Sequence, residues 1–135
     1  MIALVSVARK SGRALSLLLI AIICALGYAC ANYSHTGPAA IVGTWTNGFG
    51  TVWSVKSDGT FDVDLNGDSR RDAWGRYAVD GDTVTIHGTG GIARADCKGD
   101  GVYRFTRSGD TLRFNRVHDN CKLRVKNILL VWHRK

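Results

Sequence analysis

The sequence predicts an all-β protein folded as an eight-stranded antiparallel up-and-down β-barrel. Three observations carry this prediction. The chain has 11 acidic residues, all of them Asp, so that Glu, a common residue of helices, is absent. Sixteen Gly and one Pro indicate many tight turns. An alternating segment, a Gly-Asp or Asp-Gly turn and a second alternating segment follow one another three times along the chain.

The three repeats occupy residues 52–63, 77–86 and 103–114. Each predicts one β-hairpin, and the period of two assigns its side chains to opposite faces. The inward positions hold large apolar residues, and the outward positions hold polar ones. The predicted inward set is Trp53, Val55, Phe61, Val63, Leu65, Val84, Ile86, Tyr103, Phe105, Leu112 and Phe114.

Two further strands are predicted outside the repeats, at residues 41–46 and 127–133. The second is apolar on both faces. Together with the three hairpins they give eight strands, and the short connections favour a barrel in which the last strand closes against the first. The expected organisation is a signal peptide over 1–31, a polar tether over 32–40 and the barrel over 41–135.

The N-terminal segment has the pattern of an export signal. Arg9, Lys10 and Arg13 form a positive region, and the uncharged apolar run 14–26 follows it. This run is the length of a signal-peptide core and is shorter than the roughly 20 residues of a membrane-spanning helix. Three outcomes stay open: a lipoprotein lipidated at Cys30, cleavage after the A-x-A sequence 29–31, and an uncleaved anchor. Each places the barrel outside the cytoplasm, in the periplasm, at the outer membrane through the lipid, or secreted.

The cysteines predict one disulfide. Cys24 lies in the signal core and Cys30 is the lipidation candidate, so Cys97 and Cys121 remain for the folded part. Both lie twelve residues from Gly109, the centre of the third hairpin, so a bridge between them would join the open end of that hairpin. The alternative is a metal site that adds His118 and His87, although the spacing of these residues is not typical of one.

Gly43-Thr44-Trp45 on the first predicted strand resembles the G-x-W signature of lipocalins and related calycins. In that family an Arg on the last strand packs over the Trp, and Arg134 matches by position. Residues 45–47 are also similar to the opening of avidins. The size of the chain is nearest to small bacterial lipocalin-like lipoprotein domains. The resemblance implies that Gly43, Trp45 and Arg134 close the barrel, and that ligands bind its interior at Trp53, Phe61, Tyr77, Tyr103, Phe105 and Phe114.

The motifs of common enzymes are missing from the sequence. It contains no Gly-x-Ser-x-Gly, no P-loop and no H-E-x-x-H. The Gly-rich segment 87–91 is expected to be a flexible loop, because no helix follows it. We therefore expect a protein that is not an enzyme, with no catalytic residues and no cofactor.

One loop has the spacing of a calcium site. Asp64, Asn66, Asp68 and Asp72 repeat the ligand positions that begin an EF-hand loop. Gly75 stands where the bidentate Glu belongs, and the neighbouring Arg70 and Arg71 would repel a cation. The sequence therefore favours a plain turn and no metal.

Charge is distributed unevenly along the chain. Residues 32–96 carry five cations and eight anions, a net −3, whereas residues 97–135 carry ten cations and three anions, a net +7. Arg104, Arg113, Lys122, Arg124 and Lys126 form an expected face for anionic partners. Nucleic acid is not expected for an exported protein without interleaved exposed aromatic residues.

Two functions are expected from these observations. The first is non-catalytic carriage of a small apolar or amphipathic ligand inside the barrel. The second is an envelope-surface interaction or inhibitor module that uses the basic face of residues 97–126.

Overall fold

A computed structural model describes residues 36–92 and 97–135. The chain divides into two units, Met1–Tyr33 and Ser34–Lys135, and the barrel belongs to the second. The expected signal peptide 1–31, the candidate lipidation site Cys30 and the first residues of the tether lie outside the described residues. None of the helices within the two described ranges is long and apolar enough to span a membrane.

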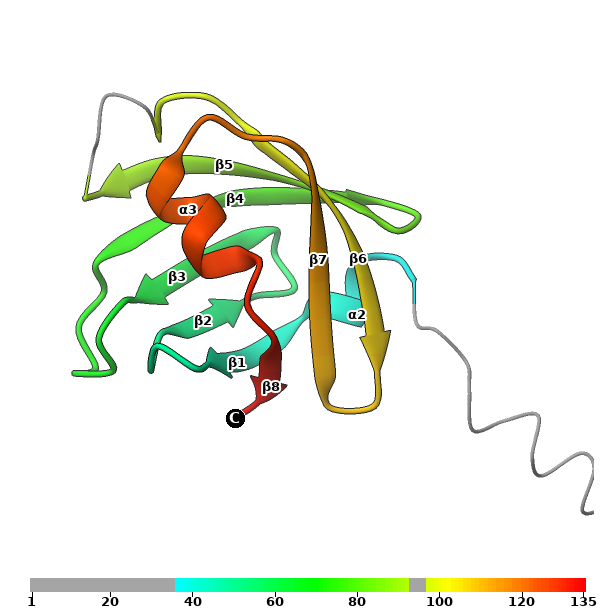
Figure 1. Cartoon of the computed structure of the whole chain (residues 1–135), viewed down its shortest axis with the longest axis horizontal. Coiled ribbons are helices and arrows are strands. Elements are labelled where there is room, and N and C mark those ends of the chain that lie inside the picture. The colour runs from blue at the N-terminus through cyan, green and yellow to red at the C-terminus, as the bar shows by residue number, and fades with distance from the viewer. Residues whose placement is uncertain (1–35, 93–96) are drawn as a thin grey trace, which may run out of the picture. The chain divides into compact units, whose positions relative to one another are not determined.

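The second unit is a closed antiparallel barrel of eight strands in the order β1-β2-β3-β4-β5-β6-β7-β8, which confirms the predicted fold class (Figure 1). Every strand pairs with its neighbours in sequence, and β8 pairs with β1 and β7. The strands are β1 Gly43–Asn47, β2 Val52–Val55, β3 Thr60–Asp64, β4 Ala73–Asp80, β5 Thr83–Gly91, β6 Gly101–Ser108, β7 Thr111–His118 and β8 Trp132–Arg134; the helices are α2 Pro38–Ile41 and α3 Lys122–Ile128.

The core consists of the residues that the alternating pattern places inward. Trp53, Val55, Phe61, Val84, Ile86, Tyr103, Phe105, Leu112 and Phe114 are all buried. Trp45 and Trp132, from the first and last strands, complete it. Their rings meet edge to face or tilted, as between Trp53 and Phe114, whose centroids are 5.7 Å apart.

The end of the barrel at which β1 begins is closed by α2. The expected tether 32–40 overlaps this helix, in which Ala40 is buried beside Ile41. Ile41 was expected to begin the first strand, but its carbonyl accepts a hydrogen bond from Trp45 Nε1 at 2.7 Å and the strand begins at Gly43. The local sequence allows this because Pro38 stands in the first turn of the helix.

The predicted last strand, 127–133, is wrong in its first half. Asn127 and Ile128 end α3, and only Trp132–Arg134 is extended. An apolar run of this length fits a strand or a helix equally well, so periodicity cannot decide between them.

The Gly-rich segment 87–91, expected to be a loop, is the second half of β5. Two of its glycines, Gly90 and Gly91, are needed for close packing against β4 and the residue before it. A Cβ on Gly90 would lie 2.4 Å from the Trp74 ring, and a Cβ on Gly75, opposite, would lie 2.0 Å from the His87 carbonyl oxygen. The pairing shifts register between Trp74 and Gly75, as at a β-bulge.

Candidate functional site

A cavity of about 260 Å³ opens at the end of the barrel opposite α2. Strands β2 to β5 form one side of it, and the disulfide and α3 form the other. Its lining is largely apolar: Thr51, Trp53, Phe61, Val63, Leu65, Ala73, Trp74, Ile86, Gly88, Thr89, Gly90, Ile92, Cys97, Lys98, Cys121, Leu123, Arg124, Asn127, Ile128 and Trp132. Small-molecule sites in proteins have this character, an apolar concavity with a few polar groups.

Helix α3 lies across this end of the barrel (Figure 1). Leu123 and Ile128 from the helix line the cavity, and Ile128 is buried. The helix begins at the cap residue Cys121, whose Sγ accepts a hydrogen bond from the Arg124 N–H. Because the seven-residue helix is too short to be stable alone, its position depends on contacts with the barrel.

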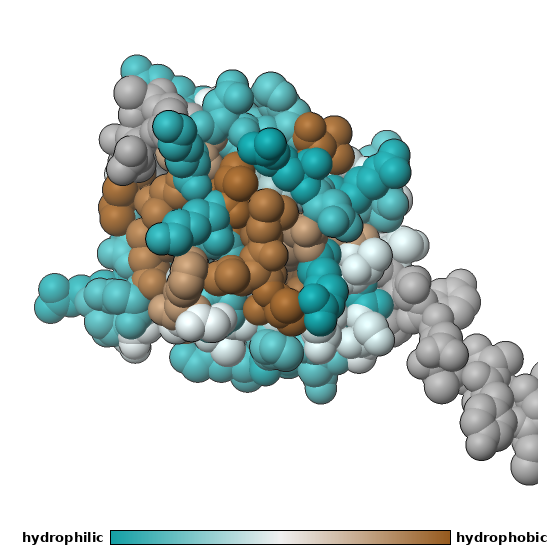
Figure 2. Space-filling view, viewed as in Figure 1, coloured by the Kyte–Doolittle hydropathy of each residue, from teal (hydrophilic) through white to brown (hydrophobic). Residues whose placement is uncertain are grey.

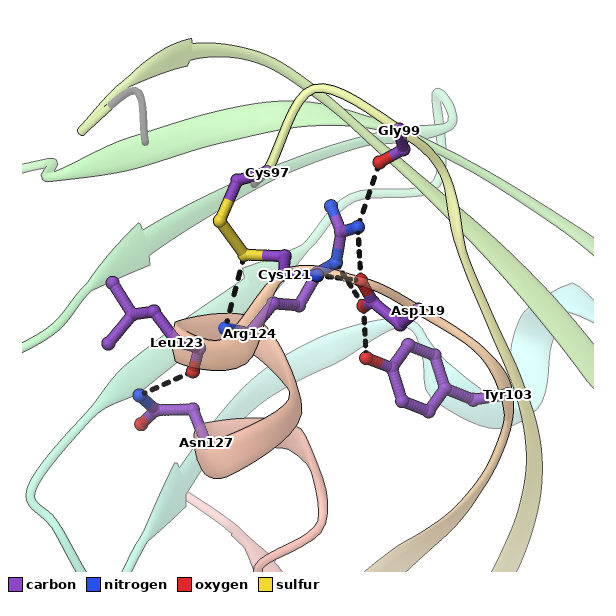
Figure 3. The surroundings of a disulfide bond; sticks show 8 residues. All are labelled: Cys97, Gly99, Tyr103, Asp119, Cys121, Leu123, Arg124 and Asn127. Atoms are coloured by element: carbon purple, nitrogen blue, oxygen red, sulfur yellow. Dashed lines mark hydrogen bonds and ion pairs between the residues drawn. A yellow bond between two sulfur atoms is a disulfide. The ribbon is translucent and has the colours of Figure 1, made fainter. Parts of the chain in front are cut away.

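Cys97 and Cys121 form the disulfide that the sequence predicts (Figure 3). The bond ties the residue that caps α3 to the segment that leads into β6. Both cysteines line the cavity. Since both sulfurs are used in this bond, the alternative metal site with His118 and His87 is not formed, and no cluster of three or more potential metal ligands occurs among the described residues.

A second tether is an ionic network around Asp119 (Figure 3). The Asp119 side chain is fully buried and forms an ion pair with Arg124, whose Nε lies 2.5 Å from Oδ2. The Tyr103 hydroxyl donates to the same oxygen, and the Cys121 N–H donates to Oδ1 at 2.7 Å. Arg124 Nη2 also donates to the Gly99 carbonyl at 2.8 Å, so the network joins α3 to both strands of the third hairpin.

Burial raises the pKa of Asp119, but the hydrogen bonds from Arg124, Tyr103 and the Cys121 backbone together hold this pKa below its ordinary value of 3.8. Burial, reinforced by the Asp119 carboxylate, raises the pKa of the Tyr103 phenol. Asp119 is therefore a carboxylate and Tyr103 a neutral donor at neutral pH, and both groups serve the fold.

One edge of the cavity is polar. Thr51 Oγ1 lies 2.8 Å from Asn127 Oδ1 and 3.0 Å from the Leu65 carbonyl oxygen. Asn47 Nδ2 reaches Asn127 at 3.4 Å. A second hollow shares Thr51, Leu65, Leu123 and Asn127 with the cavity and extends it toward Phe49 and Lys126. The hydrogen bonds at this edge satisfy one another and hold α3 over the barrel end.

The six expected ligand residues divide into three groups. Trp53 and Phe61 line the cavity. Tyr103, Phe105 and Phe114 belong to the packed core and do not line it. Tyr77 is partly buried and packs against the core without lining the cavity, and its hydroxyl donates to the Lys56 carbonyl at 2.6 Å.

The contact of Arg134 with Trp45 that the resemblance implies is present where the first and last strands meet. The Arg134 guanidinium carbon lies 4.4 Å from the centroid of the Trp45 ring, and Nη1 donates to the Val42 carbonyl at 2.9 Å. A Cβ on Gly43 would lie 1.5 Å from Arg134 Nη1, which explains why glycine stands there. Trp45 packs in this closure and does not line the cavity.

The loop of residues 64–72, which has the spacing of a calcium site, is a turn stabilised by hydrogen bonds to its own carboxylates. Asp64 Oδ1 accepts hydrogen bonds from the Asn66, Gly67 and Asp68 N–H groups, and Oδ2 accepts one from Ser69 N–H at 2.8 Å. Asp72 Oδ2 accepts from the Leu65 N–H at 2.7 Å. These backbone donors use the oxygens that a calcium ion would need.

The expected basic face is only partly exposed. Arg104, Arg113, Lys122 and Lys126 are exposed, and Lys126 Nζ lies 5.2 Å from the centroid of the Phe49 ring. Arg124 does not belong to this surface, because its largely buried guanidinium forms an ion pair with Asp119. This ion pair forms because α3 lies close to β6, and the sequence alone does not show that contact.

An exposed His–Asp pair was not anticipated. His87 Nδ1 lies 2.5 Å from Asp100 Oδ1, although thirteen residues separate them in sequence. The pair stands on the outer side of β5, because His87 follows the inward Ile86. No sequence pattern signals it, since Asp100 lies on the connection into β6.

The comparisons with known proteins identify no relative: no protein-family model, curated protein or solved structure matches the chain. The closed eight-stranded antiparallel barrel is compatible with a lipocalin-like fold.

Proposed function

We propose that the protein is an exported, non-catalytic carrier of a small apolar or amphipathic molecule, of lipocalin type, which binds in the cavity beneath α3. The observation that carries the proposal is the cavity itself. It has a volume of about 260 Å³, is lined by Trp53, Phe61, Ile86 and Trp132, and stands open to solvent at one end.

The volume limits the size of the ligand. An apolar cavity of about 150 Å³ binds benzene. The cavity of this protein is larger, but lies below the range of about 300–1,000 Å³ that is usual for drug-sized ligands. A substituted single ring or a short acyl chain fits this space, and burial of its apolar surface would supply the affinity.

The export part of the proposal rests on the pattern of residues 9–26 and on the Cys97–Cys121 disulfide, since disulfides form and persist mainly in oxidising compartments. Lipidation at Cys30 is the proposed anchor. Mass spectrometry of the mature protein tests it, with a diacylglyceryl group on Cys30 as the expected result and an unmodified mature N-terminus beyond Cys30 as the contrary one.

The carrier function is tested with 1-octanol, which is neutral and short enough for the cavity. Trp53, Trp74 and Trp132 line the cavity, whereas Trp45 does not. We expect a saturable change in tryptophan emission on titration. Because octanol carries no charge, this change should persist at high salt, unlike binding to the basic residues.

Two variants on the same strand provide the control. Ala73 lines the cavity, and Ala78 is exposed on the outer side of β4. Ala73→Phe fills the cavity and should abolish the response, while Ala78→Phe should preserve it with a similar melting temperature. Absence of any response in the parent protein, or equal responses in both variants, contradicts the proposal.

A further inference from the structure

Strand β7 is much longer than its partner on one side. It runs from Thr111 to His118 and pairs with β6 over almost its whole length. On the other side β8 pairs with it only at Thr111 and Leu112. Residues 113–118 therefore form a strand edge to which no described strand is paired.

The backbone groups at this edge can be identified. In an antiparallel pair, alternate residues direct their N–H and C=O groups to opposite sides of the strand. Arg134 N–H donates to the Asp110 carbonyl at 2.8 Å, which directs the even-numbered positions toward β8. Phe114 and Arg116 continue this series. Outside the ladders, no backbone hydrogen bond between described residues reaches either of them.

The side chains along the edge are cationic and apolar. Arg113 and Arg116 are exposed, and Val117 is 59% exposed. Leu129 lies shortly before Trp132, the residue paired with Leu112, and is 45% exposed. Figure 2 shows apolar surface gathered on this side of the molecule, between polar groups.

The charge near this edge indicates which kind of segment could pair with it. Within residues 97–135 there are ten cations and three anions. Two of these anions are already paired, Asp119 with Arg124 and Asp100 with His87. A second copy of β7 would bring like charges opposite one another, which destabilises a strand pair. Arg113 is paired with the exposed Thr106 and Arg116 with the inward Tyr103, so the two arginines lie on opposite faces of β7. An extended segment with acidic residues three positions apart meets both arginines, and apolar residues between them meet the apolar surface.

We propose that the free edge of β7, residues 113–118, receives an extended acidic segment of a partner protein as an added strand. Main-chain hydrogen bonds to Phe114 and Arg116 would give the affinity, and Arg113 and Arg116 would select the charge. This surface lies outside the cavity, so the inference stands or fails separately from the carrier function.

The test uses the purified full chain and a short synthetic peptide in which two Glu residues are separated by two Val residues. Calorimetry should show binding that weakens as salt rises, since the ion pairs are exposed. Hydrogen exchange should show new protection at the amides of Phe114 and Arg116. The peptide with Lys in place of Glu, and the acidic peptide N-methylated on the residues that face β7, should not bind.

Matched charge reversals complete the experiment. Arg113→Glu with Arg116→Glu should weaken binding by about tenfold or more, because two attractive pairs become repulsive. Arg70→Glu with Arg76→Glu makes the same charge change at exposed positions elsewhere and should leave the affinity near that of the parent protein. No binding of the acidic peptide, binding without protection at the two amides, or equal losses in the two double variants each overturns the proposal.

Discussion

Asp119 shows how one residue can join three parts of this molecule. Its oxygens accept hydrogen bonds from Tyr103 on β6, from Arg124 on α3 and from the backbone that begins the helix. Gly101 makes room for this arrangement, since a Cβ there would lie 2.4 Å from Asp119 Oδ2. Removal of one member of a buried ion pair leaves the other uncompensated.

Asp119→Asn should therefore lower the free energy of unfolding at neutral pH by about 3–5 kcal/mol. The pKa of Asp119 is lowered in the folded state, so its contribution is present above the ordinary value of 3.8 and is lost as pH falls through the folded pKa. The difference between parent and variant should thus shrink below about pH 4. Denaturant titrations across pH measure it. Asp80→Asn, at an exposed position, is the control, and a difference that does not change with pH contradicts the assignment.

Among the secondary-structure elements, α3 is held in position by contacts at both of its ends. The disulfide and the Asp119 network hold its beginning, and the contact of Asn127 with Thr51 holds its end. Strong helix propensity is not required of such a segment. This explains how a helix forms in a chain whose composition predicts strands.

Replacement of both Cys97 and Cys121 by Ala should destabilise the protein by about 3 kcal/mol, because the bridge spans 24 residues of sequence and restricts the unfolded chain. For a barrel of this size, that loss lowers the melting temperature by roughly 10–20 °C. Thermal unfolding followed by circular dichroism measures it. Reductant should lower the melting temperature of the parent and leave the double variant unchanged; a variant that melts with the oxidised parent would refute the prediction.

At the scale of the whole molecule, the barrel is closed by a strand of three residues. Trp132 is buried between β1 and β7, and Arg134 pairs with Trp45 in register as well as packing on its ring. All pairing between the two ends of the sheet passes through this strand. Closure therefore makes the stability of the barrel depend on its last few residues.

A chain that ends at Val131 should lose cooperative unfolding. Loss of a buried Trp alone costs about 3–5 kcal/mol, a large share of the roughly 5–15 kcal/mol that stabilises a typical domain. Near-ultraviolet circular dichroism should show the loss of fixed aromatic packing. Lys135→Ala, which keeps β8, should melt like the parent. A truncated chain with a sharp transition would show that β8 is dispensable.

The fold class, the inward residues and the disulfide could be predicted from the sequence alone, because each depends on short-range patterns. The alternation of Trp53, Val55 and Phe61 specifies a face, and the Gly-Asp turn at Gly109 sets the register that brings Cys97 to Cys121. The G-x-W resemblance likewise indicated the contact of Trp45 with Arg134.

Three features could not be predicted without the three-dimensional arrangement: the helix at residues 122–128, the ion pair of Arg124 with Asp119, and the choice of aromatic residues that line the cavity. Each of these depends on which segments meet at one end of the barrel. Tyr103 and Phe61 have the same inward pattern and both belong to the core, yet only Phe61 also lines the cavity. Periodicity gives the face of a strand, whereas position along the barrel axis is set by the stagger of all eight strands.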